Sequence, residues 1–230
     1  MSASDGLLLI DKPQGWTSHD VVAAIRGRLP RGTKVGHTGT LDPMATGLLV
    51  LLVGRATKEA QRLQGHSKVY YGRIRLGVET ETADMEGKVT RERPVPNVTP
   101  EALQALFDQH VGELHLPPPI YSAVKVQGRP LYDYARKGVA VAVKPRVQTV
   151  TAWKLLSWKE PEAEFRLSCL GGTYVRSLAV SVGEKLGCGG AVSELRREMV
   201  GDVSVLASIG AAEAKALTAE QLYARVLPIA

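Results

Sequence analysis

The sequence predicts one domain in which short β-strands and α-helices alternate along the chain. Short apolar runs bounded by turn residues are typical of strands, and they recur between residues 6 and 170. Segments with apolar residues at helical spacing lie between them, and they begin at threonines suited to capping. No repeat and no low-complexity linker interrupts the 230 residues, a length that allows a large core. Periodicity alone leaves the topology of the strands open.

The first strand and the first helix are predicted at the N-terminal end. Residues 6–10, GLLLI, form a strand that stops at the turn sequence DKPQG. Residues 17–29 follow as a helix, because Thr17 and Asp20 have the spacing of a capping box. Pro30 ends this helix.

Four further elements are predicted before residue 112. Residues 48–53, LLVLLV, predict a buried strand, and residues 55–65 predict a helix. Residues 67–77 predict a strand with an alternating apolar face. The clearest helix spans residues 99–112, with Thr99 as its N-cap. Its apolar stripe consists of Leu103, Leu106, Phe107, His110 and Val111.

In the C-terminal half of the chain the sequence pattern indicates fewer helices and strands. Residues 116–138 are rich in proline and carry no clear period. Residues 163–170 alternate as a strand does, and residues 171–187 pass from a glycine turn into a helix. A last helix begins at Thr218, with Gln221 completing a capping box.

The charge and the cysteine content indicate which classes of partner and of metal or disulfide site to expect. The net charge of +6 favours a polyanionic partner such as nucleic acid, although the same charge also serves solubility. Cys169 and Cys188 form no CxxC motif and sit in no histidine cluster, so we expect neither a disulfide framework nor a metal site. No apolar run approaches the roughly 20 residues that span a bilayer, and we expect no signal peptide. These features predict a cytoplasmic protein.

The sequence VGHTGTLDPMATGLL, residues 35–49, combines three glycines with one carboxylate, Asp42. Asp-Pro is itself a turn signal, so the local sequence favours a structural role for Asp42. The glycines would let the backbone approach a ligand closely, which favours a chemical role. The segment lacks the Gly-Lys-Ser/Thr spacing of a phosphate loop, and GxGxxG is absent, so a nucleotide-binding enzyme is not indicated.

Three other polar residues have ordinary structural explanations when each is considered alone. His37 could be a hydrogen-bonded loop histidine, and Tyr70 could be a core residue of its strand. Arg176 could cap a helix or pair with a surface carboxylate. Composition and periodicity therefore predict a basic protein with one unusual loop, and no more.

Six long motifs, in this order, resemble the TruB family of tRNA pseudouridine synthases. They are GLLLIDKPQGWTSHDVV, KVGHTGTLDPMATGLLVLLVGRATK, KVYYGRIRLGVETETADMEG, PPPIYSAVKVQGRPLYDYARKG, CLGGTYVRSLAVSVGEKLGCGG and ELRREMVG, and they cover nearly the whole chain. The resemblance implies an α+β pseudouridine synthase fold, with a mixed, largely antiparallel sheet, flanking helices and an RNA-binding cleft. It implies an isomerase that converts the uridine at position 55, in the T-arm of tRNA, to pseudouridine without a metal or other cofactor.

The family pattern assigns catalytic roles to three residues. Asp42 matches the catalytic carboxylate, which either attacks C1′ of the ribose or removes the C2′ proton; the sequence leaves both open. Arg176 matches the arginine after Gly-Thr-Tyr and would lower the pKa of Asp42 as a bidentate partner. Tyr70 matches the tyrosine of K-x-Y, which can stack on the base and remove the C5 proton.

The resemblance also implies a set of substrate-binding residues. His37 matches the histidine that fills the space left by the flipped-out uridine, and Leu195 matches an apolar pocket residue. Tyr174 belongs to the same Gly-Thr-Tyr motif and is expected to contact substrate. Residues 117–138 resemble an insertion that grips RNA. Its expected RNA contacts are Tyr121, Lys125 and Arg129.

We expect residues 1–230 to form the catalytic domain of a monomer whose partner is tRNA, without a small-molecule cofactor or a membrane. Many family members carry a C-terminal PUA-like domain, and this chain ends at YARVLPIA, about where that domain would begin, so we expect it to be absent. A different hypothesis is an RNA-folding chaperone, which needs only the binding surface and base flipping. Because Asp42, Tyr70 and Arg176 are all present, we expect catalysis as well.

Overall fold

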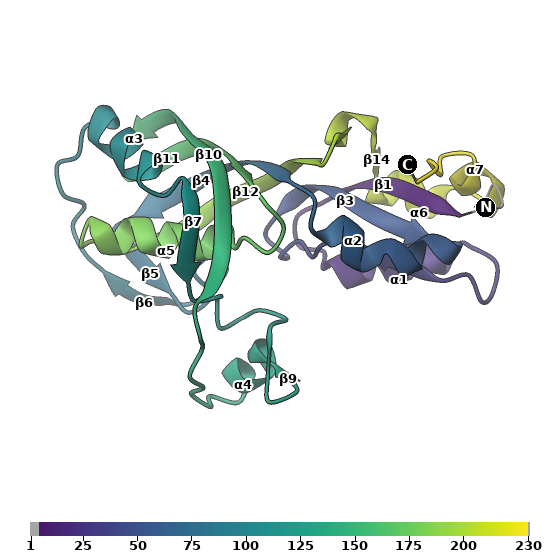
Figure 1. Ribbon diagram of the computed structural model, residues 1–230, viewed down its shortest axis with the longest axis horizontal. Coiled ribbons are helices and arrows are strands. Elements are labelled where there is room, and N and C mark those ends of the chain that lie inside the picture. Colours follow the sequence, from purple (N-terminus) through teal and green to yellow (C-terminus); the bar gives the residue numbers. More distant parts are fainter. Residues whose placement is uncertain (1–4, 230) are drawn as a thin grey trace. The chain divides into compact units, whose positions relative to one another are not determined.

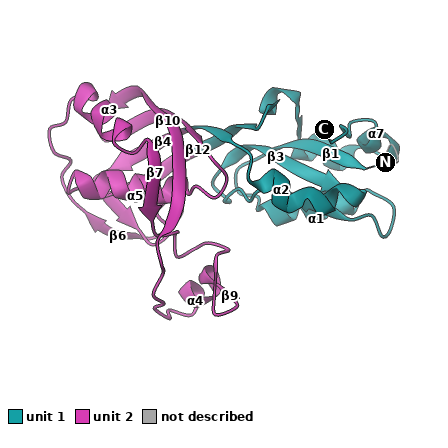
Figure 2. Ribbon diagram, in the orientation of Figure 1, with its two compact units in different colours: residues 1–71, 195–230 teal, residues 72–194 magenta. Residues whose placement is uncertain are grey.

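The computed structural model describes residues 5–229 and divides into two compact units (Figure 2). Unit 1 comprises residues 1–71 and 195–230, and unit 2 comprises residues 72–194. Two strands, β4 (Lys68–Leu76) and β12 (Gly190–Val200), run from one unit into the other. The ten-stranded sheet is mixed, mostly antiparallel and flanked by helices, which confirms the α+β fold class expected from the sequence.

The sheet of unit 1 has the strand order β14-β1-β3-β12 (Figure 1). Strands β1 and β3 are antiparallel, whereas β1 pairs in parallel with β14 and β12 pairs in parallel with β3. Short strands β2 and β13 add to β3 and β12. The bounds are β1 (Gly6–Lys12), β2 (Val35–His37), β3 (Thr46–Val53), β13 (Val203–Ser204) and β14 (Ile209–Gly210).

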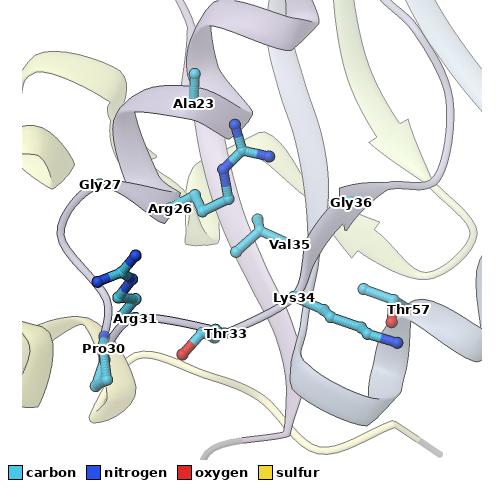
Figure 3. A pocket seen from close by; sticks show the side chains of 11 residues that line it. Ala23, Arg26, Gly27, Pro30, Arg31, Thr33, Lys34, Val35, Gly36 and Thr57 are labelled. Carbon is cyan, nitrogen blue, oxygen red and sulfur yellow. The ribbon is translucent and has the colours of Figure 1, made fainter.

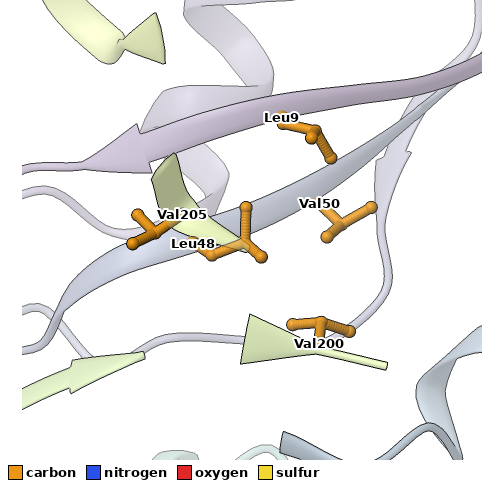
Figure 4. Packing of buried hydrophobic residues seen from close by; sticks show 5 residues of the cluster. All are labelled: Leu9, Leu48, Val50, Val200 and Val205. Carbon is orange, nitrogen blue, oxygen red and sulfur yellow. The ribbon is translucent and has the colours of Figure 1, made fainter. Parts of the chain in front are cut away.

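Strands β1 and β3 form because nearly every residue in them is apolar and buried on pairing. Their register places Leu9 opposite Val50. Part of the core of unit 1 is a cluster built from these strands, from the last residue of β12 and from the chain that follows it (Figure 4). The residues of this cluster are Leu9, Leu48, Val50, Val200 and Val205.

The helices of unit 1 follow the predicted caps. Helix α1 (Ser18–Arg26) begins at Thr17, whose side chain and that of Asp20 form the expected capping box. The predicted helix over 55–65 is wrong in its first half, because Gly54–Glu59 form a 3₁₀ helix before α2 (Ala60–Gln64). The remaining helices are α6 (Ala211–Ala216), α7 (Ala219–Tyr223) and a 3₁₀ turn, Val205–Ala207.

The sheet of unit 2 has the strand order β12-β4-β11-β10-β7 (Figure 1). Strand β10 is antiparallel to both β11 and β7. The bounds are β7 (Gly112–Leu116), β10 (Arg146–Lys159) and β11 (Glu162–Cys169), with helices α3 (Pro100–Asp108) and α5 (Val175–Lys185). A separate hairpin consists of β5 (Val78–Thr80) and β6 (Val89–Glu92).

An aromatic cluster ties α3 to the sheet of unit 2. Phe107 of α3 stacks on Trp153 of β10 with ring centroids 4.2 Å apart, and Phe165 of β11 meets both rings edge-on. His110 meets Trp153 edge-on and is buried as predicted, although α3 ends at Asp108 and not at the predicted residue 112. Val111 is 43% exposed, so its place in that stripe was wrong.

The segment between β7 and β10 forms a small structure of its own in unit 2 (Figure 1). It contains the hairpin β8 (Lys125–Val126) and β9 (Arg129–Pro130), followed by α4 (Leu131–Arg136). Gln127 and Gly128 both have positive φ angles, 51° and 79°, as a two-residue hairpin turn requires. Within residues 5–229, no helix is long and apolar enough to cross a bilayer.

Candidate active site

Asp42 lies in the connection between β2 and β3 of unit 1 and is half-buried. Its carbonyl oxygen accepts a hydrogen bond from the backbone N–H of Ala45, 3.1 Å away. Asp-Pro therefore begins a tight turn, as the local sequence predicted. The turn uses the backbone of Asp42, so it does not by itself explain why a carboxylate stands at this position.

The residue before Asp42 is anchored to the start of α1. Ser18 is buried, and its hydroxyl accepts a hydrogen bond from the Leu41 N–H (2.8 Å) and donates one to the Leu41 carbonyl (3.0 Å). Both backbone polar groups of Leu41 are thus satisfied by one side chain. This arrangement holds the peptide that leads into Asp42.

The residue after Asp42 is anchored by a buried lysine. Lys12 is fully buried, and its Nζ donates to the carbonyl oxygens of Pro13 (2.9 Å), Trp16 (2.6 Å) and Pro43 (3.2 Å). The Gly15 N–H donates to the same Pro43 carbonyl at 2.9 Å. Asp42 therefore stands between two fixed peptides, which limits the positions that its carboxylate can take.

His37 ends β2, five residues before Asp42, and its ring is half-buried. The Gly39 N–H donates to Nδ1 of His37 at 3.2 Å. Burial lowers the pKa of His37, and the positive charges of Arg197 and His19 lower it further. His37 is accordingly a neutral ring at neutral pH, with Nδ1 as the hydrogen-bond acceptor.

Tyr70 and Leu195 lie on two neighbouring strands of the sheet, β4 and β12. Both are buried, with exposed fractions of 6% and 5%. Tyr70 occupies the buried face of β4, where buried residues alternate with more exposed ones.

Arg176 lies in the first turn of α5 in unit 2 and is buried. Its guanidinium donates to the carbonyl oxygens of Thr82 (2.9 Å) and Tyr121 (3.1 Å). Nη1 also lies 3.8 Å from Oδ2 of Asp84, a buried carboxylate. Arg176 therefore pairs with a buried acid, and the alternative of a surface carboxylate is wrong.

The remaining predicted substrate contacts are also in unit 2. Tyr174 occupies the N-cap position of α5 without a capping side-chain hydrogen bond, and its N–H donates to Oε1 of Gln148 at 2.7 Å. Tyr121 begins the small structure between β7 and β10 and is held to Arg176 through its carbonyl. Lys125 and Arg129 are exposed on the β8–β9 hairpin, so both charges are available to a polyanion.

The predicted site residues fall into two groups. Four of them belong to unit 1, and five belong to unit 2. The first group is His37, Asp42, Tyr70 and Leu195, and the second is Tyr121, Lys125, Arg129, Tyr174 and Arg176. Within unit 2, the structure joins Arg176 to Tyr121 directly and leaves Lys125 and Arg129 on a hairpin of their own.

A basic hollow of about 780 Å³ lies between the end of α1 and the chain that leads into β2 (Figure 3). Arg26 comes from the last turn of α1, and Arg31 and Lys34 come from the connecting loop. Thr57 of the 3₁₀ helix completes one wall. Three cations and a hydroxyl around one hollow suit an anion such as a phosphate group.

Among residues 5–229, no group of three or more His, Cys, Asp or Glu side chains is arranged to hold a metal ion. Cys169 and Cys188 are both buried free thiols.

The residues that support the site could not be predicted in the same way. Arg197 follows Leu195 by two positions, so strand alternation could have predicted a buried arginine on the same face. Lys12 and Ser18 lie within the first family motif but carry no pattern that reveals burial. Asp84, in ETADMEG, also gives no sequence signal of its pairing with Arg176.

A family model described as TruB family pseudouridylate synthase (N terminal domain) matches residues 28–175. A curated relative from Opitutus terrae, called tRNA pseudouridine synthase B, is 42% identical over 225 residues, covering 98% of this chain and 93% of the relative. One of the same name from Ralstonia pickettii is 48% identical over 204 residues, covering 87% of this chain and 64% of that protein.

Solved structures agree with these relatives at the level of the fold. A chain of a Cbf5-Nop10-Gar1 complex matches with a TM-score of 0.69 and 27% identity, and a chain of an archaeal box H/ACA sRNP Nop10-Cbf5 complex matches with a TM-score of 0.69 and 24% identity. Each match covers 98% of this chain and 60% of the solved one, so the chain spans less than two thirds of their length. The family match over residues 28–175, and relatives that align along almost the whole chain, show that this protein belongs to the TruB family and is a pseudouridine synthase.

Proposed function

We propose that this protein converts the uridine at position 55, in the T-arm of tRNA, to pseudouridine, with Asp42 as the catalytic carboxylate. The observation that carries the proposal is the double anchoring of the Asp42 loop, by Ser18 on one side and Lys12 on the other. The curated relatives, which are called tRNA pseudouridine synthases, support tRNA as the substrate. A polyanionic substrate also suits the net charge of +6.

The reaction breaks the bond between C1′ of the ribose and N1 of uracil and forms a bond between C1′ and C5. The base stays in the pocket, and the proton on C5 is replaced by one on N1, so the isomerisation needs no oxidant and no group donor. A carboxylate beside C1′ can stabilise the developing positive charge, attack that carbon or remove the C2′ proton, as in the related chemistry of glycosidases. We assign this task to Asp42.

The other predicted residues supply positioning and proton transfer. Tyr70 stacks on the base and accepts the C5 proton, directly or through water. Arg176 keeps the catalytic carboxylate ionised. His37, a neutral ring, fills the space that the uridine leaves when it flips out, and Leu195 gives the pocket an apolar surface.

The substrate is bound chiefly through its phosphates. In unit 1, the hollow formed by Arg26, Arg31 and Lys34 is a site for the RNA backbone. In unit 2, Lys125 and Arg129 on the exposed hairpin serve the same purpose. The proposed enzyme works as a monomer in the cytoplasm, where unmodified tRNA is available, and its binding surface also assists tRNA folding.

The test is Asp42→Asn, with Asp202→Asn as the matched control. Asparagine keeps the size of the side chain and removes the negative charge, so the variant is expected to bind unmodified tRNA as the wild type does but to form no pseudouridine. Asp202 is an exposed turn residue of the same unit, and its variant is expected to retain full activity. The readout is position-resolved mapping of pseudouridine in tRNA after multiple turnovers.

Two results would overturn the assignment. Substantial product from Asp42→Asn would remove the carboxylate from the reaction. Loss of tRNA binding in parallel with loss of product would make Asp42 a structural turn residue. If the Asp42→Asn variant still assists tRNA folding, the folding role is independent of catalysis.

A further inference from the structure

Arg197 and Lys12 are the largest fully buried side chains among the described residues. Arg197 lies on β12 and is 1% exposed. A guanidinium in this position is shielded from water, which is costly unless its donors are satisfied. An apolar side chain would fill the same volume at a lower cost in desolvation free energy. The role of the guanidinium is therefore found in the groups to which it is hydrogen-bonded.

The guanidinium of Arg197 is hydrogen-bonded to the backbone on both sides of Asp42, to the loop before it and to β3 after it. Nε donates to the carbonyl oxygen of Leu48 at 2.7 Å, and Nη2 donates to the carbonyl oxygen of Gly39 at 3.0 Å. Gly39 precedes Asp42 by three residues, and Leu48 follows it by six. One planar guanidinium thus links the chain before Asp42 to the chain after it.

The backbone of Gly39 links Arg197 to His37. Its carbonyl accepts from Arg197, and its N–H donates to Nδ1 of His37 at 3.2 Å. A shift of Gly39 therefore moves the acceptor of Arg197 and the donor of His37 together. His19 of α1 is the other charged group that acts on His37.

The backbone of β3 lies unusually close to Arg197. Gly47 pairs with Arg197 in the parallel β3–β12 register, and its φ is +98°. A Cβ on Gly47 would overlap the carbonyl oxygen of Arg197, so only glycine allows this approach. Lys12 and Ser18 hold the peptides next to Asp42, whereas Arg197 holds the base of the loop and the histidine.

We propose that Arg197 is a positioning residue of the isomerisation: through the backbone of Gly39 it fixes both the His37 ring and the course of the loop that presents Asp42. The inference rests on the proposed function, because it takes Asp42 as the catalytic group and His37 as the stacking group. In this proposal Arg197, which is 1% exposed, acts through the backbone and not by contact with the substrate.

The experiment compares Arg197→Lys and Arg197→Met with Arg196→Met. Arg196 is the matched control, because it is the adjacent arginine of the same strand and its guanidinium pairs with the carboxylate of Asp11 at 2.7 and 3.0 Å. Each variant is assayed for kcat and KM on unmodified tRNA, for tRNA affinity, and for the thermal unfolding midpoint. The His37 imidazole is titrated by NMR in the free protein.

For Arg197→Met we expect kcat to fall about 100-fold, as a misplacement of about 1 Å produces, with KM and tRNA affinity within about threefold of the wild type. Arg197→Lys keeps the charge but cannot bridge both carbonyl oxygens. Its kcat should therefore lie between that of the wild type and that of Arg197→Met. The His37 pKa should rise in Arg197→Met, because a neighbouring positive charge is removed, and stay unchanged in Arg196→Met.

Equal losses of kcat in Arg196→Met and Arg197→Met, or an unmoved His37 titration in Arg197→Met, would overturn the proposal. If Arg197→Met does not fold, Arg197→Lys carries the test, and wild-type kcat in that variant would overturn the proposal. Failure of the proposed function is a separate result, because it appears as activity of Asp42→Asn and leaves the His37 titration of the free protein unaffected.

Discussion

Arg176 and Asp84 form an ion pair in which both side chains are only 5% exposed, with Nη1 and Oδ2 3.8 Å apart. Asp84 is held from its other side by the Thr82 hydroxyl at 2.5 Å and the Glu86 N–H at 3.1 Å, both at Oδ1. The same guanidinium donates to the Thr82 and Tyr121 carbonyls. Arg176 is therefore fixed in a satisfied polar network, which is the condition under which a buried charge is stable.

Asp84→Asn is expected to destabilise the protein by about 3–5 kcal/mol, because it removes the carboxylate from a buried ion pair with Arg176. Urea unfolding followed by circular dichroism measures this loss. The double variant Asp84→Leu/Arg176→Met removes both charges and should recover much of the stability while remaining inactive. A loss below about 1 kcal/mol in Asp84→Asn, the range of an exposed pair, would mean that the pair is effectively solvated.

Gly47→Ala is expected to destabilise unit 1, because alanine is strained at a φ of +98° and its Cβ would overlap the Arg197 backbone. Strain alone costs about 1–3 kcal/mol, and the overlap adds to it. Gly36→Ala is the control, since its Cβ would meet only a methyl group of Thr57 at 3.7 Å, an ordinary contact. Chemical unfolding of the two variants should give clearly different midpoints, and equal midpoints would contradict the close approach.

Elements with strong local signals could be predicted from the sequence. The capping boxes at Thr17 and Thr218 are present, and the strands around Leu9 and Val50 lie where the apolar runs predicted them. Strands β10 and β12 were not predicted. In β10, residues of mixed polarity alternate irregularly, and the register shifts at two places, so no period of two is visible in the sequence.

Only those site residues that lie in a recognisable sequence motif could be predicted. Asp42 stood out because a carboxylate occurs among glycines, but its anchors depend on contacts between residues far apart in the chain. Ser18 lies 23 residues from Leu41, and Arg197 lies 158 residues from Gly39. No local pattern encodes such pairs, because the fold alone brings them together.

The stability of the folded protein is expected to fall as the pH decreases from 7.5 to 5.5, in part because of His110. Burial lowers the pKa of His110, partly offset by the hydrogen bond between Nδ1 and the Leu106 carbonyl. The unfolded state therefore binds more protons below a pH of about 6.5 than the folded state does, so stability is lost as the pH falls through that region.

The matched variant for His110 is His110→Gln, which removes the titrating group. The free energy of unfolding in urea should depend less steeply on pH between 7.5 and 5.5 in this variant than in the wild type. His37, whose pKa is also lowered by burial, should account for part of the remaining slope. An unchanged slope in His110→Gln would show that His110 titrates alike in both states.

The basic hollow of unit 1 is expected to contribute to RNA affinity through charge alone. Arg31→Gln and Lys34→Gln should each weaken tRNA binding and reduce the slope of log affinity against log salt by roughly 0.7–0.9 for each phosphate that is no longer neutralised. Lys215→Gln is the control, because Lys215 is exposed on α6 of the same unit and does not line the hollow. Equal slopes in all three variants would exclude this hollow from the RNA interface.

Tyr70→Phe separates stacking from proton transfer. Phenylalanine keeps the ring that can pack on uracil, so tRNA binding should stay within about threefold of the wild type. Only the hydroxyl can accept the C5 proton, so release of pseudouridine should fall about 100-fold or more. Tyr71→Phe is the matched control, because successive residues of β4 point to opposite faces of the sheet, and it should retain activity.

The stage at which Tyr70→Phe stops gives a second readout. If the glycosidic bond still breaks and C1′ still joins C5, the proton on C5 remains, and an RNA species with a rearranged base should accumulate on the enzyme. Denaturing gel electrophoresis and mass spectrometry of the tRNA detect such a species. An adduct in which C1′ is bonded to Asp42 would instead show that the reaction stopped before the C1′–C5 bond formed. Normal turnover in Tyr70→Phe would leave Tyr70 as a stacking platform only and would require water or another side chain as the base.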